Sequence, residues 1–235
     1  MNNKGVVIGD GMLAEASRKY AFDEAGMVVF ASGVSNSNCA SVAEFNRERE
    51  LLRKVIRDNS NMKVLYFSTC SIYDQSLVGK SLYVEHKKEM ESLFSHHPNH
   101  LIIRLTQVVG KSRNPNLLSN YFFSTIKNRR EIKVQKSAVR NIIDVDDVMR
   151  FLNRIKNTDE FRNQTVDLGS LRYDPAMRIA QVMGEVLWIE PIIVEVEGGS
   201  AYSIDTSFTN RFQCDVGVNF NDDYLRRVFS KYYGA

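Results

Sequence analysis

The sequence predicts an α/β fold, in which a parallel sheet is flanked by helices. The first indication is the start of the chain, where an apolar strand from Lys4 to Ile8 runs directly into a glycine turn and a helix that extends to about Phe22. The second is the order of the segments that follow, because apolar strands at residues 27–31, 64–67 and 101–105 alternate with helical patterns. Strands that alternate with helices are typical of parallel sheets.

Length and composition are those of one globular unit. A chain of 235 residues can bury one substantial core, so we expect a single domain over residues 1–235, with its core in about 1–110 and a small lobe drawn mainly from 111–130 and 165–235. The net charge of +3 does not require a nucleic-acid or membrane partner, and no apolar run approaches the roughly 20 residues of a membrane span. The polar start and three widely spaced cysteines predict a cytoplasmic protein with no metal site.

The turn after the first strand has the pattern G-x-G-x-x-A, beginning at Gly9 and Gly11. Backbone donors and the dipole of the following helix converge at such a turn, where a pyrophosphate can bind. We therefore expect Gly9, Gly11, Met12 and Leu13 to contact a phosphate-bearing cofactor. A tight turn without a ligand is the alternative interpretation.

Residues 41–58 predict a long amphipathic helix. Ser41 and Glu44 have the spacing of a capping box at its start. One apolar stripe is formed by Val42, Phe45, Leu52 and Ile56. We interpret the charged remainder of the helix as a solvent-exposed face.

The segment from residue 64 to residue 87 contains the spacing that implies chemistry. Its strand ends in the hydroxyl cluster Ser68, Thr69 and Ser71, and Tyr83 and Lys87 lie one helical turn apart on the same face. Lowering the pKa of a phenol from about 10 towards 7 takes about 4 kcal/mol, which a lysine in a desolvated cleft can supply. Tyr83 would then act as an acid or base near neutral pH, with Thr69 holding the substrate oxygen. By spacing alone, an ordinary surface helix is the alternative.

The order of strand, Ser-Thr-x-x-Ile-Tyr, loop and Tyr-x-x-x-Lys helix resembles the extended short-chain dehydrogenase/reductase superfamily, in particular its nucleotide-sugar epimerases, dehydratases and reductases. The resemblance implies a Rossmann-like sheet with a catalytic trio of Thr69, Tyr83 and Lys87. It implies NAD or NADP as cofactor, with Lys87 holding the ribose and His86 in no direct role. The further cofactor contacts that it implies are Ala31, Ser32, Gly33, Ser68, Leu105 and Val108.

The chain departs from this family after its first helix. Only residues 23–26 separate that helix from the next strand, whose end, Ala31-Ser32-Gly33, resembles the end of the fourth strand of the family. We therefore predict that the second and third strands are absent. Because those strands usually hold the adenosine half of the cofactor, the choice between NAD and NADP stays open.

Three further residues are expected to contact a nucleotide-sugar substrate. The resemblance assigns Asn116 to the sugar nucleotide and Arg140 to its diphosphate, and Ser71 lies beside Thr69. Family dehydratases carry an Asp-Glu pair where this chain has Cys70 and Ser71, which disfavours dehydration. Reduction and epimerisation both remain, and family analogy indicates bacterial surface polysaccharide (capsule or O-antigen) synthesis.

Two other functions stay open. The shortened N-terminal half allows a non-catalytic Rossmann-fold protein that senses a ligand or serves as a scaffold. Nucleic-acid binding through the basic residues 127–136 is disfavoured because Glu131 interrupts them. Relatives commonly pair through the Tyr-x-x-x-Lys helix, so we expect a homodimer with Met90 and Phe94 buried between the subunits.

The remaining segments predict the small lobe. We expect helices at residues 117–128, at 174–187 and at 222–232, a short helix from Asp205, and strands at 164–168 and 192–196. Asp146 and Asp147 are expected to cap or begin the helix that follows residue 145.

Overall fold

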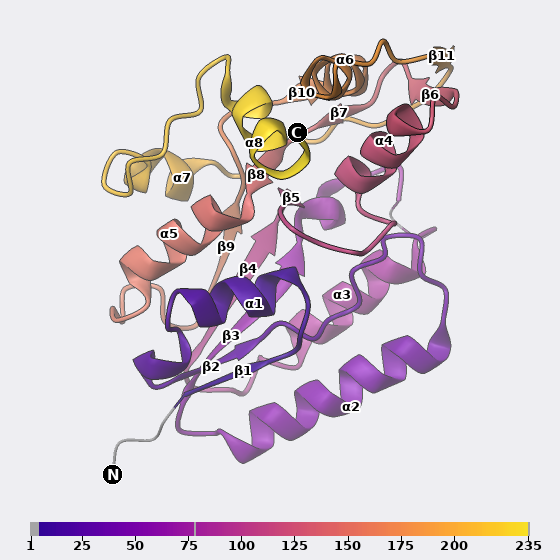
Figure 1. Ribbon diagram of the computed structural model, residues 1–235. Coiled ribbons are helices and arrows are strands. Elements are labelled where there is room, and N and C mark those ends of the chain that lie inside the picture. Colours follow the sequence, from indigo (N-terminus) through magenta and orange to yellow (C-terminus); the bar gives the residue numbers. More distant parts are fainter. Residues whose placement is uncertain (1–4, 78, 235) are drawn as a thin grey trace.

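The computed structural model describes residues 5–77 and 79–234, and its centre is a five-stranded parallel sheet (Figure 1). The strand order is β1-β2-β3-β4-β9. The strands are β1 (Val6–Ile8), β2 (Met27–Phe30), β3 (Lys63–Thr69), β4 (His100–Leu105) and β9 (Gln164–Leu168). The predicted parallel sheet is confirmed, although Lys4 lies outside the described residues.

Strand β2 is buried on both faces of the sheet, and its four residues are all apolar. Val28 and Phe30 pack on one face, whereas Met27 and Val29 point to the other. Such continuous apolar runs are typical of parallel strands that are covered by helices on both sides.

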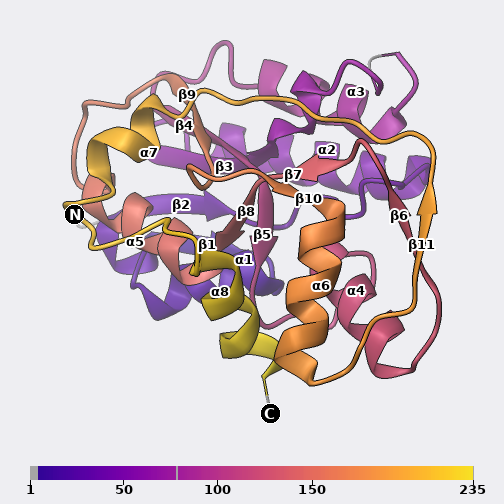
Figure 2. The same ribbon diagram turned by 90° about the horizontal axis from the view of Figure 1, so that it is seen from above.

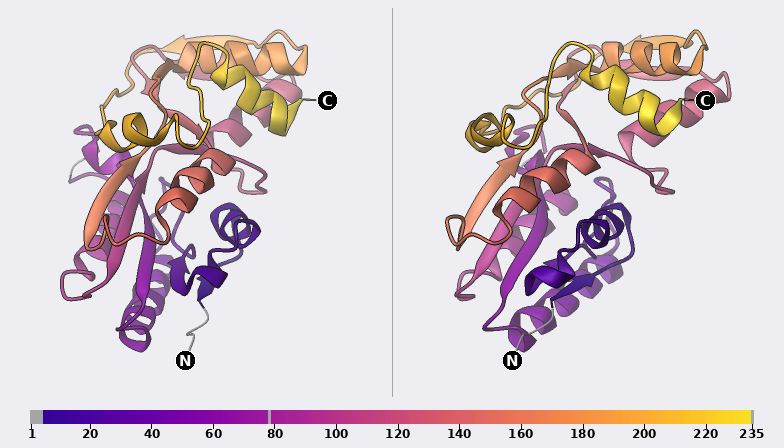
Figure 3. Two further views of the ribbon diagram at one scale, coloured as in Figure 1. Left: turned by 90° about the vertical axis from the view of Figure 1, so that its left-hand side faces the viewer. Right: turned by 60° about the vertical axis from the view of Figure 1, so that its left-hand side comes forward.

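The two faces are covered by different pairs of helices (Figures 1 and 3). Helices α2 (Val42–Asp58) and α3 (Leu82–Ser92) cover one face, and α1 (Met12–Lys19) and α5 (Val145–Ile155) cover the other. The side chains of Ser41 and Ser81 cap α2 and α3. Asp144 caps α5, because its Oδ1 accepts the backbone N–H of Asp146, and Asp146 and Asp147 lie in the first turn of the helix, as expected.

The predicted loss of two strands is confirmed by the position of β1 at the edge of the sheet. Between α1 and β2 lie only a turn and a short 3₁₀ segment, Asp23–Ala25. The guanidinium of Arg18 donates to the carbonyl oxygens of Val7 and Gly9. Arg18 therefore satisfies part of an edge that the missing strands would otherwise cover.

The C-terminal part forms a lobe beyond the carboxyl ends of the sheet strands (Figures 1 and 2). Strands β5 (Gln107–Val109) and β8 (Ile142–Asp144) pair with each other beside the sheet and connect it to the lobe. A parallel pair, β6 (Ile132–Gln135) and β11 (Ile193–Val196), and an antiparallel pair, β7 (Val139–Arg140) and β10 (Asp174–Pro175), complete its strands. Its helices are α4 (Leu118–Lys127), α6 (Ala176–Leu187), α7 (Ser207–Phe212) and α8 (Tyr224–Tyr233).

The expected role of Met90 and Phe94 at a dimer interface is wrong. Both side chains are buried in the chain's own core, where they pack with Phe30, Tyr66 and Leu52 beneath the sheet. They are therefore not available to a second subunit. Within the part of the chain that the structure describes, no helix combines the length and apolarity that crossing a membrane requires.

Gly9 is required by the backbone at the end of β1. Its φ is +117°, and a Cβ there would lie 2.4 Å from the carbonyl oxygen of Ala31. We expect Gly9→Ala to lower the free energy of unfolding by at least about 2 kcal/mol, because both backbone strain and this overlap must be relieved. Urea denaturation measures the change.

Gly11→Ala is the matched control for that substitution. A Cβ at Gly11 would meet nothing within 4 Å, and the φ of Gly11 is −81°. We expect its effect on stability to stay within about 0.5 kcal/mol. Equal losses in the two variants would contradict the special role of Gly9.

Candidate active site

A cavity of about 430 Å³ lies at the carboxyl ends of β1, β2 and β3, between the sheet and the loop that leads to α4. Ligands of open α/β sheets bind at this edge of the sheet. Nearly all of the predicted site residues line it. They are Gly11, Met12, Leu13, Ala31, Ser32, Gly33, Ser68, Thr69, Ser71, Tyr83, Lys87, Leu105, Val108 and Asn116.

The glycine turn supplies free backbone donors to the cavity. Gly11 occupies the N-cap position of α1, and no side chain satisfies the first N–H groups of that helix. Because a Cβ at Gly11 would meet nothing within 4 Å, the turn leaves space beside those donors. The turn therefore fits a phosphate group, which helix N-termini favour. Gly9 supports the turn without lining the cavity.

Thr69 and Tyr83 meet at one wall of the cavity. Thr69 is the last residue of β3, and the Ser81 cap begins α3 two residues before Tyr83. Burial raises the pKa of the Tyr83 phenol well above its usual value, and the nearby Glu48 carboxylate and Tyr202 raise it further. A hydrogen bond with the Thr69 side chain opposes this rise. At neutral pH Tyr83 is therefore a neutral phenol, able to give a proton.

Lys87 does not have the effect on Tyr83 that the sequence led us to expect. Its Nζ donates to Glu48 Oε1 at 2.9 Å and to the Tyr66 hydroxyl at 3.2 Å. The ammonium lies 5.9 Å from the centre of the Tyr83 ring. Burial, followed by the charge of the Glu48 carboxylate, therefore raises the pKa of Tyr83 instead of letting it fall. The expectation that Lys87 lowers the pKa of Tyr83 is therefore wrong, whereas Lys87 does line the cavity, as predicted.

Glu48 is the functional residue that sequence reasoning missed. Its side chain is 0% exposed, although it was assigned to a solvated face of α2. A signal existed, because Glu48 lies three residues after Phe45 and four before Leu52, within the buried stripe of the helix. That stripe continues through Val55, while Val42 is 69% exposed.

Ser68 and Ser71 flank Thr69 in different environments. The Ser68 hydroxyl donates to Glu91 Oε1 at 2.6 Å, which leaves its oxygen as an acceptor. The backbone N–H of Ser71 donates to the Thr69 hydroxyl oxygen at 3.1 Å. Ser71 also shares a hydrogen bond with Tyr202, a residue from an irregular stretch that no sequence pattern marked. Tyr202 thus brings the C-terminal lobe to this wall.

The structure places the two other predicted substrate residues differently. Asn116 lines the cavity next to Leu117. Arg140 does not line it, because its Nη1 donates to the carbonyl oxygens of Val139 and Ser200, each at 2.9 Å. Arg47, which the sequence did not mark, reaches the cavity and donates to the hydroxyl and carbonyl oxygens of Ser32.

The chain matches no protein-family model and no curated protein. Its fold matches solved structures. One is a UDP-glucuronic acid 4-epimerase from Bacillus cereus in complex with UDP-glucuronic acid and NAD, with 12% identity, a TM-score of 0.71, and coverage of 88% of this chain and 74% of that one. Another is RMD from Pseudomonas aeruginosa complexed with NADPH, with 14% identity, a TM-score of 0.73, and coverage of 96% and 97%.

A UDP-N-acetylglucosamine 4-epimerase from Bacillus cereus has a similar likeness, with 14% identity, a TM-score of 0.69, and coverage of 98% of this chain and 99% of that one. At these identities the likeness establishes the fold. It confirms the Rossmann-like architecture that the resemblance implied, and it leaves the chemistry to the residues of the cavity.

Proposed function

We propose that this chain is an NAD(P)-dependent oxidoreductase or epimerase that acts on a nucleotide-activated sugar. The observation that carries the proposal is the wall shared by Thr69 and Tyr83, with Lys87 nearby, in a cavity that reaches the helix donors at Gly11. The solved relatives of the same fold, which hold NAD or NADPH, support it.

The residues present fit the phosphate and nicotinamide-ribose portion of such a cofactor. Gly11, Met12 and Leu13 would hold its phosphates, while Gly33 and Lys87 would lie along the ribose. When bound, a reduced nicotinamide supplies a hydride to a carbonyl carbon. The adenosine half would extend past β1, where the guanidinium of Arg18 donates to the carbonyl oxygen of Val7 and that of Arg47 lines the cavity beside Ser32.

The chain's own residues would move the proton. Thr69 would orient the carbonyl oxygen of the sugar through a hydrogen bond. Tyr83 would give its phenolic proton to that oxygen as the hydride reaches the carbon, so that a ketone becomes an alcohol. Solvent would then restore the phenol. In the reverse direction the phenol would first lose its proton to solvent, and the Tyr83 phenolate would then take up the proton of the alcohol as the hydride leaves the carbon.

The finer assignments also belong to the proposal. Cys70 and Ser71 stand where dehydratases of the family carry acids, so reduction and epimerisation are the reactions considered. We place the enzyme in bacterial surface-polysaccharide precursor synthesis, on family analogy. A homodimer would have to use residues other than Met90 and Phe94.

Turnover of reduced cofactor tests the proposal. We expect the protein to oxidise NADH or NADPH when it is mixed with 4-keto nucleotide sugars, and the loss of cofactor absorbance measures this. Calorimetry with each cofactor alone separates this function from the non-catalytic alternative that the exposed edge of β1 favours. A cofactor concentration of about 1 mM would reveal even weak specific binding. If neither cofactor released or absorbed heat at that concentration, the result would favour the non-catalytic scaffold protein.

A further inference from the structure

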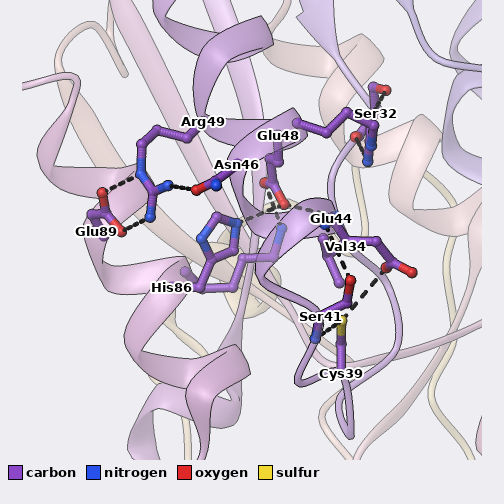
Figure 4. Close-up of polar contacts among 12 residues, drawn as sticks. Ser32, Val34, Cys39, Ser41, Glu44, Asn46, Glu48, Arg49, His86 and Glu89 are labelled. Carbon is purple, nitrogen blue, oxygen red and sulfur yellow. Dashed lines mark hydrogen bonds and ion pairs between the residues drawn. The ribbon is translucent and has the colours of Figure 1, made fainter.

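A buried polar cluster is built on the carboxylate of Glu48, next to the cavity wall at which Thr69 and Tyr83 meet. Figure 4 shows its carboxylate between His86 and Val34. One oxygen accepts the Tyr66 hydroxyl at 2.8 Å and the Lys87 ammonium at 2.9 Å. The other accepts the backbone N–H of Val34 at 2.7 Å and Nε2 of His86 at 3.0 Å. All four acceptor positions of the carboxylate are therefore used.

This cluster holds one buried charge of each sign. Glu48 and Lys87 are 0% and 3% exposed. Burial by itself raises the pKa of the Glu48 carboxyl, but the hydrogen bond from His86, the charge of Lys87 and the N–H of Val34 lower it to about 2. The carboxylate stays charged at any pH at which the protein works. It therefore cancels the Lys87 charge permanently.

Gly33 shows how closely the ammonium is held. A Cβ at this position would lie 2.6 Å from Lys87 Nζ and 3.0 Å from Glu48 Oε1. The ion pair thus packs directly against the backbone at the end of β2, in the wall of the cavity. Lys87 has three N–H donors and uses two of them on Glu48 and Tyr66, which leaves one for a ligand.

We propose that Glu48 is a positioning residue, which fixes the Lys87 ammonium against Gly33 and cancels its charge. Lys87 then serves as a hydrogen-bond donor to a ligand hydroxyl, and Tyr83 stays a neutral proton donor. The ligand role rests on the proposed function, whereas the charge-cancelling role does not. In this arrangement the site favours giving a proton to a carbonyl over taking one from an alcohol.

The groups that face Tyr83 and Lys87 come from five parts of the fold. They are Glu48 from α2, Tyr66 from β3, His86 from α3, Tyr202 from the C-terminal lobe, and the Cys39 thiol from the loop before α2. Lys87 is the only lysine or arginine among these groups, and the Glu48 carboxylate accepts a hydrogen bond from its ammonium. Removing that carboxylate should let the phenol ionise more readily.

Tyrosinate absorbance during alkaline titration tests this in the cofactor-free protein. Each protein is compared with its Tyr83→Phe counterpart, so that the difference reports Tyr83 alone. We expect Glu48→Gln to move the ionisation of Tyr83 towards neutral pH by at least about 1 unit. Glu50→Gln, at an exposed site on the same helix, is the matched control and should cause no shift.

The double variant Glu48→Gln/Lys87→Met protects the test against a folding failure, because it leaves no buried charge unpaired. Because it removes both charges, its Tyr83 should ionise near the wild-type value and above that of Glu48→Gln. Ionisation of Glu48→Gln at the wild-type pH would overturn the charge-cancelling role, and so would a double variant that ionises as low as Glu48→Gln, because the shift would then not come from Lys87. Calorimetry with NADH should show about 10-fold weaker binding for Glu48→Gln, corresponding to one lost hydrogen bond. Unchanged affinity would overturn the ligand role of Lys87.

The two proposals fail in different ways. Absence of turnover together with a shifted Tyr83 titration would remove the enzyme function and leave the role of Glu48 in place. Turnover together with an unshifted titration would retain the enzyme function and remove the role of Glu48.

Discussion

Replacing Tyr83 with phenylalanine is expected to lower kcat by about 10²- to 10⁴-fold, the range typical of losing a positioned proton donor. The substitution removes only the phenolic oxygen, because the ring keeps its packing against Val34 and Phe45. Oxidation of reduced cofactor with a 4-keto nucleotide sugar measures the change in kcat.

Tyr121→Phe is the control for this experiment. Tyr121 is on α4, its side chain is 43% exposed, and it does not line the active-site cavity. We expect this variant to turn over at the wild-type rate. Activity in Tyr83→Phe close to that of Tyr121→Phe would remove Tyr83 from the mechanism.

The sequence could predict most of the cavity wall because strand ends and glycine turns are local features. In a parallel sheet the carboxyl ends of neighbouring strands meet at one edge. The ends of three apolar runs, at Ile8, Phe30 and Thr69, therefore had to come together once the strands were recognised. The loss of two strands was equally visible, because too few residues separate α1 from β2 to form them.

The partner of Lys87 could not be predicted in the same way. Helical spacing places Lys87 and Tyr83 on one face of α3, but it does not say which neighbouring element supplies a counter-charge. Glu48 is 39 residues away on another helix. The spacing of α2 does place Glu48 in its apolar stripe. A glutamate is rarely buried without a partner, however, so its burial could not be predicted before Lys87 was known to face it.

Arg140 illustrates a second limit of the sequence. A guanidinium suits a diphosphate by its chemistry, but backbone carbonyls of strand β7 and of an irregular loop compete for the same donors. Those carbonyls, on Val139 and Ser200, have no sequence signature. Tyr202 reaches the site from the same loop and was missed for the same reason.

Lys87→Met is expected to lower the free energy of unfolding by about 3–5 kcal/mol, because it leaves the Glu48 carboxylate buried without its cation. The double variant Glu48→Gln/Lys87→Met should recover most of that loss, since a glutamine carries no charge, its amide oxygen can accept from Val34, and its NH2 group can donate to the Tyr66 hydroxyl oxygen. Urea denaturation near neutral pH measures both values.

Lys88→Met supplies the control, because the neighbouring lysine forms only an exposed pair with Glu85, at 3.1 Å. Exposed pairs contribute about 0–1 kcal/mol, so this variant should unfold close to the wild type. If Lys87→Met cost no more than Lys88→Met, water would have to reach Glu48 in the variant. A carboxylate that water can reach would act only weakly on the neighbouring phenol, so this comparison also tests whether the buried charge at Glu48 adds to the effect of burial on Tyr83.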